Sequence, residues 1–232
     1  VMLSERDEFV YHEMISHVAM FTHPLPKRVL IIGGGDGGTA REVMKHPTVE
    51  QVDMVEIDKT VVDASKLHFP GVGDFDNPKL NVLYEDGIKF VKNAKRPYDV
   101  IIIDGSDPVG PAEGLFEKDF YSCCFDALSE NGVLTAQTES PWVESYHPSM
   151  RKVFRALEDL FPISAMYLSY IPLYPAGMWS MACASKKEDP LGPGALGRAE
   201  EGAGITASLK YYNAEVHRGA FALPGFVRKI IR

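Results

Sequence analysis

Cysteine and long apolar runs are both scarce in this chain. Its 232 residues include three cysteines, two of them adjacent at Cys123 and Cys124, and these are too few for a disulfide framework. We therefore predict a reducing, cytoplasmic location. The longest aliphatic runs, at 29–32 and 100–103, are far shorter than the roughly 18–20 residues that cross a bilayer. Because the first residues also lack a basic stretch followed by an apolar one, neither a membrane span nor a signal peptide is expected.

Positive charge is in short supply as well. Lys and Arg number 24 against 32 Asp and Glu, which gives a formal net charge of −8, whereas a protein that binds nucleic acid needs a basic face. The acidic balance suits a cationic small-molecule substrate, although solubility alone is the commoner reason for such a charge. The seven histidines show no metal-ligand spacing. We expect no nucleic-acid partner and no metal site.

Short apolar segments alternate with helical patterns along most of the chain. This alternation is typical of βαβ units, and the almost continuously apolar segment 98–103 is typical of a parallel strand covered on both faces. We predict an α/β fold with a doubly wound, Rossmann-like sheet that is mostly parallel and is closed by an antiparallel strand. The predicted strands span residues 28–32, 51–57, 81–84, 98–103, 132–137, 163–170 and 179–185.

Three segments outside the sheet also carry predictions. Ser4 and Asp7 have the spacing of a capping box, so a helix with Ser4 as its N-cap should run to about residue 21. Residues 189–204 are rich in Gly, Ala and Pro, which predicts an exposed loop. The tail 209–232 is amphipathic and is predicted to be helical.

A glycine cluster follows the first predicted strand and opens a helix. Gly33, Gly35 and Gly38 satisfy the G-x-G-x-x-G spacing in the strand–turn–helix context that a nucleotide or nucleoside site requires. Glu56 ends the second predicted strand, 18 residues after Gly38, where an acid accepts hydrogen bonds from ribose hydroxyls. NAD and S-adenosyl compounds both carry that diol, so these two features leave the ligand open.

Two further acids favour an S-adenosyl compound. Asp36 lies inside the glycine cluster, where its charge would repel a pyrophosphate but would attract a sulfonium that bears an amine. Asp86 and Gly87 follow the third predicted strand, where a carboxylate can accept a hydrogen bond from an adenine amino group. Together with Glu56, these residues predict an S-adenosyl site in a sheet of the class I methyltransferase type.

A second cluster of acids follows the apolar strand 98–103. Asp104 and Asp107 are three residues apart, and Pro111 is among the residues that stiffen the loop after them. Ligands bind at the carboxyl ends of strands in open α/β sheets, so one carboxylate can bind a cation while the other accepts a proton. The alternative is an Asx-turn in which the Asp side chains cap backbone amides.

Polar and aromatic residues later in the chain can complete this crevice. Gln137 and Glu139 stand at the end of another predicted strand, although Glu139 suits an N-cap equally well. Tyr174 and Trp179 can form a slot for an alkylammonium chain through cation–π contacts. Aromatic residues in such a position are more often part of the core.

The motifs together resemble the spermidine synthase family, the polyamine aminopropyltransferases. The resemblance covers nearly the whole chain and is carried by residues 5–14 (ERDEFVYHEM), 33–38, 55–58 (VEID), 85–90 (EDGIKF), 104–111 (DGSDPVGP), 137–140, 174–177 and 210–224. It implies transfer of an aminopropyl group from decarboxylated S-adenosylmethionine, as co-substrate, to putrescine, giving spermidine and 5′-methylthioadenosine. It also implies no prosthetic group, and a homodimer or homotetramer.

The resemblance assigns roles to individual residues. Asp104 matches the general base, Asp107 matches its partner in holding the diamine, and Tyr11 and Tyr174 match tyrosines that orient the acceptor. The acceptor region also includes Gln137, Glu139 and Trp179, and the nucleoside site includes His12, Gly33, Gly35, Asp36, Glu56, Asp86, Gly87 and Pro111. The chain departs from the family at Gly105, where members usually carry Ser or Thr, and this change should loosen the loop.

Several alternatives stay open at this stage. An amine N-methyltransferase that uses S-adenosylmethionine shares the fold and most of the motifs, and the acceptor could be cadaverine, agmatine or spermidine. An inactive polyamine or nucleoside sensor is the third alternative. The resemblance also implies a β-stranded N-terminal domain, of which residues 1–3 would be the remnant, before a catalytic domain at 4–232.

Overall fold

The computed structural model describes residues 3–106, 110–174 and 176–232. Within these residues the strands form one seven-stranded sheet in the order β3-β2-β1-β4-β5-β7-β6. β7 is antiparallel to both of its neighbours, and the pairings among the other strands are parallel. The strands are β1 Arg28–Gly33, β2 Gln51–Val55, β3 Leu80–Leu83, β4 Tyr98–Asp104, β5 Leu128–Glu139, β6 Ile163–Tyr170 and β7 Met178–Ser185. The predicted α/β fold is confirmed.

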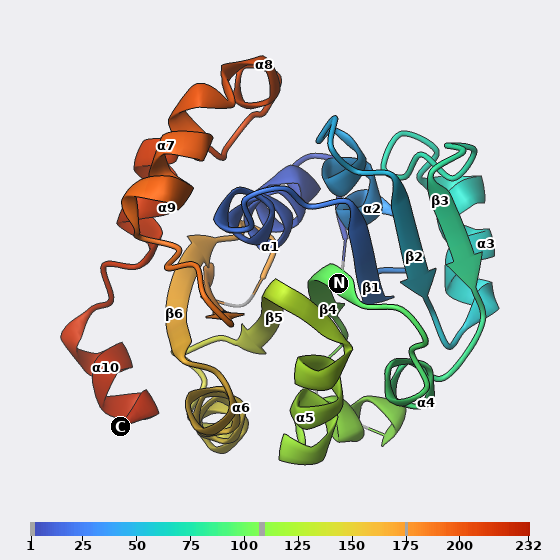
Figure 1. The fold of residues 1–232 in the computed structure, drawn as a ribbon. Coiled ribbons are helices and arrows are strands. Elements are labelled where there is room, and N and C mark those ends of the chain that lie inside the picture. Colours follow the sequence, from blue (N-terminus) through green and yellow to red (C-terminus); the bar gives the residue numbers. More distant parts are fainter. Residues whose placement is uncertain (1–2, 107–109, 175) are drawn as a thin grey trace.

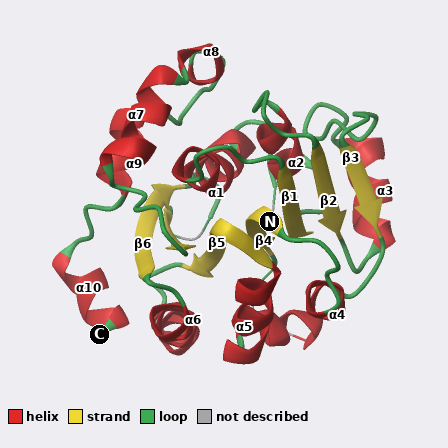
Figure 2. Cartoon of the chain, in the orientation of Figure 1, coloured by secondary structure: helices red, strands yellow, loops and turns green. Residues whose placement is uncertain are grey.

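Helices cover both faces of the sheet, as Figures 1 and 2 show. α1 and α2 lie on one face, and α4, α5 and α6 lie on the other. None of the helices in the described residues is long and apolar enough to cross a membrane. The helices are α1 Glu8–Thr22, α2 Gly38–Met44, α3 Lys59–His68, α4 Gly87–Lys92, α5 Lys118–Ala127, α6 His147–Leu160, α7 Pro193–Glu201, α8 Ala203–Thr206, α9 Ala214–Ala220 and α10 Gly225–Ile231, with 3-10 helices η1 Gly110–Phe116 and η2 Glu144–Tyr146.

The central strand β4 shows why its sequence is continuously apolar. Val100 and Ile102 point into the core beneath α1 and α2. Ile101 and Ile103 point into the core beneath α5 and α6. All four side chains are almost fully buried, so each face of the strand needs apolar residues. Asp104 follows immediately and is carried to the carboxyl edge of the sheet.

The predicted start of the first helix is wrong. α1 begins at Glu8, and its N-cap residue is Asp7, whose side chain makes no capping hydrogen bond. The carbonyl of Ser4 instead accepts from the backbone N–H groups of Asp7 and Glu8, which form a separate turn. The capping-box spacing was misleading because the chain between Ser4 and Glu8 turns before it enters the helix.

The predicted loop at 189–204 is also wrong, because α7 occupies much of it. Pro193 stands in the first turn of α7, where the missing N–H costs nothing, and Ala195 and Ala199 are buried. Arg198 anchors the helix to the end of α1 by donating to the carbonyl oxygens of Phe21 and Thr22 at 2.9 and 2.5 Å. Residues that suit a loop by composition here form a helix because small side chains allow close packing.

Candidate active site

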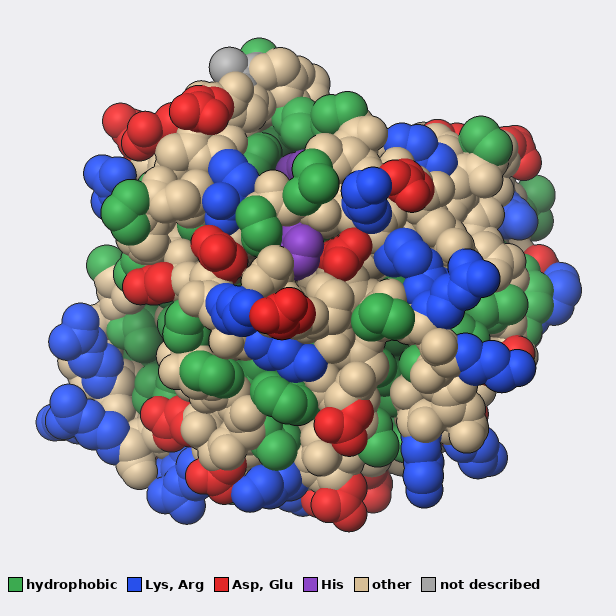
Figure 3. Space-filling view, in the orientation of Figure 1, with side chains coloured by type: hydrophobic (Ala, Val, Ile, Leu, Met, Phe, Trp, Pro, Cys, Tyr) green, Lys and Arg blue, Asp and Glu red, His purple; other side chains and the backbone are tan. Residues whose placement is uncertain are grey.

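A cavity of about 690 Å³ opens at the carboxyl ends of β1, β2 and β4. The glycine loop forms part of its wall, and α1 and the segment around Tyr174 contribute other parts. The cavity brings together ten of the residues predicted from the sequence: Tyr11, His12, Gly33, Gly35, Asp36, Glu56, Asp86, Gly87, Asp104 and Tyr174. Figure 3 shows Lys and Arg interspersed with Asp and Glu on one face of the molecule, the pattern of an ordinary hydrated surface.

The glycine loop packs against the residues that carry the charge. Gly33 has a φ of 85°, and a Cβ at this position would lie 2.1 Å from the carbonyl oxygen of Asp104. A Cβ on Gly38 would lie 2.3 Å from the His12 ring. Glycine is therefore required at both positions, first for the backbone conformation and second for the space that the imidazole fills.

Asp104 lies at the centre of the cavity with a hydrogen bond to each carboxylate oxygen. The Tyr11 hydroxyl donates to Oδ1 at 2.6 Å, and the Thr39 hydroxyl donates to Oδ2 at 2.6 Å. Burial, reinforced by the negative charge of Asp36, raises the pKa of Asp104 above its ordinary value. Burial and the charge of Asp104 also raise the pKa of Tyr11 well above 10, so the phenol keeps its proton and remains a donor.

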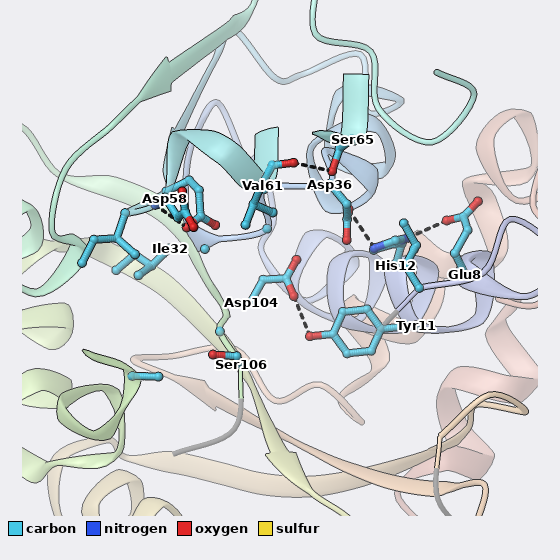
Figure 4. Close-up of a pocket in the computed structure, with 18 of the residues that line it drawn as sticks. Glu8, Tyr11, His12, Ile32, Asp36, Asp58, Val61, Ser65, Asp104 and Ser106 are labelled. Atoms are coloured by element: carbon cyan, nitrogen blue, oxygen red, sulfur yellow. Dashed lines mark hydrogen bonds and ion pairs between the residues drawn. The ribbon is translucent and has the colours of Figure 1, made fainter. Parts of the chain in front are cut away.

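A chain of three charged groups lies beside Asp104, as Figure 4 shows. His12 Nε2 is 3.2 Å from Asp36 Oδ1, and His12 Nδ1 is 2.5 Å from Glu8 Oε2. Burial alone would lower the pKa of His12, but the charge of Asp36 and the hydrogen bonds to both carboxylates raise it to about 10. Burial opposes the ionisation of Asp36, yet the protonated His12 and the backbone N–H of Gly38 lower its pKa. An imidazolium is thus held between two carboxylates.

The two acids predicted for the nucleoside, Glu56 and Asp86, also line the cavity. Glu56 Oε1 accepts from the backbone N–H of Asp58 at 2.9 Å, and burial raises the pKa of Glu56. Asp86 caps α4, because its Oδ1 accepts from the backbone N–H of Ile88 at 2.9 Å. The side chain of Asp86 therefore stabilises a helix as well as facing the cavity.

Gln137 and Trp179 lie behind the cavity in a polar cluster. Gln137 Nε2 donates to the carbonyl oxygen of Gly105 at 3.1 Å, and its Oε1 accepts from Trp179 Nε1 at 3.1 Å and from the backbone N–H of Glu139 at 3.2 Å. Among the described residues, neither they nor Glu139 contribute to the cavity wall. Trp179 instead supports Tyr174, whose ring centroid is 4.7 Å away.

Glu139 has an unusual backbone for its residue type. It is fully buried, and its φ of 86° lies in the left-handed region that favours glycine. Such a conformation costs roughly 1–3 kcal/mol and is concentrated at functional sites. The predicted role of Glu139 in the acceptor region stays a prediction.

The loop after β4 contains Gly105, where the resemblance leads us to expect Ser or Thr. A Cβ on Gly105 would lie 2.8 Å from the Leu115 side chain, so Leu115 takes the space that a larger residue would need. The carbonyl of Gly105 is held by Gln137. Asp107 lies outside the described residues, and the backbone of Pro111 belongs to η1.

Sequence reasoning missed two residues of the site, Glu8, which bonds to His12, and Thr39, which bonds to Asp104. Glu8 could have been found, because it stands four residues before His12 on one helix face. Thr39 gave no signal beyond being a polar residue after the glycine loop. Within the described residues, no group of three His, Cys, Asp or Glu side chains has a geometry suited to a metal ion.

Comparisons with known proteins show which family this chain resembles. A family model described as the spermine/spermidine synthase domain matches residues 8–191. The polyamine aminopropyltransferase of Clostridium perfringens is 45% identical over 232 residues, which cover 100% of this chain and 81% of the relative. That of Caldicellulosiruptor bescii is 48% identical over 227 residues, covering 97% and 79%.

Solved structures give the same result. A spermidine synthase in complex with the transition-state analogue AdoDATO has a TM-score of 0.90 and 43% identity, covering 99% of this chain and 77% of that one. The spermidine synthase of Thermotoga maritima has a TM-score of 0.87 and 42% identity, covering 99% and 76%. These matches confirm the resemblance drawn from the motifs. The chain belongs to the spermine/spermidine synthase family of enzymes.

Proposed function

We propose that this enzyme transfers the aminopropyl group of decarboxylated S-adenosylmethionine to putrescine, producing spermidine and 5′-methylthioadenosine. The observation that carries the proposal is the pairing of two differently held carboxylates, Asp36 and Asp104, in one cavity. Similar proteins named polyamine aminopropyltransferases, and a solved relative bound to a transition-state analogue, support it.

The cavity offers complementary groups for each part of the donor. The nucleoside of the donor would lie along the glycine loop, with the ribose hydroxyls at Glu56 and the adenine near Asp86 and Gly87. The ammonium of the aminopropyl arm would face Asp36, whose carboxylate stays charged beside the protonated His12. An ammonium–carboxylate hydrogen bond of this kind is stronger than a neutral one.

Asp104 is the general base in this proposal. A primary amine with a pKa near 10.4 costs roughly 4–5 kcal/mol to deprotonate at pH 7. The Asp104 carboxylate accepts that proton while the amine lone pair attacks the methylene next to the sulfonium. The carbon–sulfur bond breaks, and its electron pair stays on sulfur. The thioether leaves uncharged, so the leaving group needs no proton.

The acceptor side of the site would hold the diamine in line with the reacting carbon. Tyr11 and Tyr174 line the cavity and would contact the acceptor directly, together with Asp107. Gln137 and Trp179 would act from behind by fixing the loop after Asp104 and the ring of Tyr174, and Glu139 would belong to the acceptor region. Assembly as a homodimer or homotetramer and a cytoplasmic location also remain predictions.

The proposal is tested by supplying each donor with each acceptor. The protein is incubated with decarboxylated S-adenosylmethionine or S-adenosylmethionine, and with putrescine, cadaverine, agmatine or spermidine. We expect 5′-methylthioadenosine to form only from the decarboxylated donor and fastest with putrescine. Methyl transfer from S-adenosylmethionine would identify an N-methyltransferase instead, and saturable binding without thioether release would identify a sensor.

A further inference from the structure

Thr39 donates a hydrogen bond to the second carboxylate oxygen of Asp104. Tyr11 reaches Asp104 Oδ1 from α1, whereas Thr39 reaches Oδ2 from the start of α2. We infer that Thr39 is a positioning residue that fixes the orientation of the Asp104 carboxylate for proton transfer. This inference rests on the proposed function, in which Asp104 is the base.

The contact is buried and connects distant parts of the chain. The Thr39 side chain is fully buried, and its Oγ1 lies 2.6 Å from Asp104 Oδ2, across 65 residues of sequence. Thr39 is the second residue of α2, so no residue of its own helix lies three or four positions earlier. Its hydroxyl bonds to the end of β4. Thr39 is absent from the described cavity wall, so it acts through Asp104 rather than on substrate.

Two donors constrain a carboxylate more than one donor does. Each oxygen of an ionised carboxylate has about two lone-pair sites, so Tyr11 and Thr39 occupy one site on each oxygen and leave one on each. With a single donor, the carboxylate could rotate about its Cβ–Cγ bond. Gly34 makes the arrangement possible, because a Cβ there would lie 2.9 Å from Asp104 Oδ2.

The same hydrogen bond favours the charged form of Asp104. Burial and the neighbouring Asp36 raise the pKa of Asp104, whereas the bonds from Thr39 and Tyr11 lower it. A base must be ionised before it accepts a proton, and donors to the carboxylate stabilise that form. The loss of the Thr39 hydroxyl should therefore both loosen the carboxylate and raise its pKa.

Two substitutions separate the hydroxyl from the shape of the side chain. Thr39→Val keeps the branched shape but removes the donor, and Thr39→Ser keeps the donor but removes a methyl group. We expect Thr39→Val to lower kcat about 10–100-fold, with the KM for the donor within about twofold of the unaltered enzyme. The acid limb of its pH–rate profile should move to higher pH. In Thr39→Ser, both kcat and the position of the acid limb should be close to those of the unaltered enzyme.

Carboxyl titration supplies a readout independent of turnover. With ¹³C-labelled aspartate, the Asp104 carboxyl signal can be assigned by its loss in Asp104→Asn, and its midpoint should rise in Thr39→Val and return in Thr39→Ser. An unchanged midpoint and kcat in Thr39→Val, or equal loss of kcat in both variants, would overturn the inference. If the unaltered protein transfers no aminopropyl group, the proposed function fails, while the titration still tests the contact.

Discussion

Asp36 and Asp104 share one cavity, but their surroundings differ in charge. Asp36 faces the imidazolium of His12, which lowers its pKa, whereas Asp104 accepts hydrogen bonds only from the neutral hydroxyls of Tyr11 and Thr39 in the described contacts. Burial and the charge of Asp36 raise the pKa of Asp104. Environments that separate the pKa values of paired acids assign them different chemical roles. Asp36 is suited to keep a negative charge that binds a cation, and Asp104 is suited to accept a proton.

The largest expected effect comes from removing the proton acceptor. Asp104→Asn keeps the shape of the side chain and one oxygen that accepts from a hydroxyl, but it cannot accept the amine proton. We expect kcat to fall about 10²–10⁴-fold, measured as release of 5′-methylthioadenosine. Affinity for 5′-methylthioadenosine, which contains neither the attacking amine nor the transferred aminopropyl group, should stay near that of the unaltered enzyme. Near-normal turnover in Asp104→Asn would remove Asp104 from the base role.

The other carboxylate should affect binding more than chemistry. Asp36→Asn keeps an oxygen for the backbone N–H of Gly38 but removes the charge that faces the aminopropyl ammonium. Loss of a charge-assisted hydrogen bond should raise the KM for the donor about 10–100-fold. The product 5′-methylthioadenosine lacks that ammonium, so its affinity, measured by calorimetry, should change little. Equal losses for donor and product would show that Asp36 acts through the loop conformation instead.

The charged groups Glu8, His12 and Asp36 also depend on Gly38, which leaves room for the His12 ring. Gly38→Ala would place a Cβ 2.3 Å from the buried His12 ring, and overpacking of this kind typically costs about 1–3 kcal/mol. Gly219→Ala is the matched control, because Gly219 lies in α9 with open space at its Cβ position. In denaturant unfolding, the free energy of unfolding should fall in Gly38→Ala and should not fall in Gly219→Ala. Identical midpoints for Gly38→Ala and the unaltered protein would contradict the crowding seen at His12.

The parts of this molecule that could be predicted from sequence are those with local causes. The glycine loop could be predicted because the backbone of Gly33 and the packing around Gly38 leave no room for a side chain. β4 is visible because both of its faces are buried, which requires a continuous apolar run. The family motifs added the prediction that Asp36 and Asp104 belong to one site, and both residues line the cavity.

What sequence reasoning missed depends on partners far away along the chain. Thr39 bonds to Asp104 across 65 residues, and Arg198 bonds to Phe21 across 177. No pattern near Thr39 or near α7 encodes those partners. Gln137, which the resemblance places in the acceptor region, donates through its amide to the backbone carbonyl of Gly105, and its role toward the acceptor stays a prediction. Packing decides which polar side chains face a cavity and which support its wall.

A further prediction concerns the pH dependence of stability that His12 confers. Its pKa rises from 6.5 to about 10 in the folded protein, so its contribution is complete below about pH 6.5 and is lost as the pH rises towards 10. Over that window the folded state holds one proton more than the unfolded state, and the free energy of unfolding should fall by about 1.4 kcal/mol per pH unit from this group. His12→Gln should remove that slope while other titrations remain. Urea unfolding from pH 6.5 to 9.5 measures the difference, and equal slopes in the two proteins would mean that His12 is neutral beside Asp36.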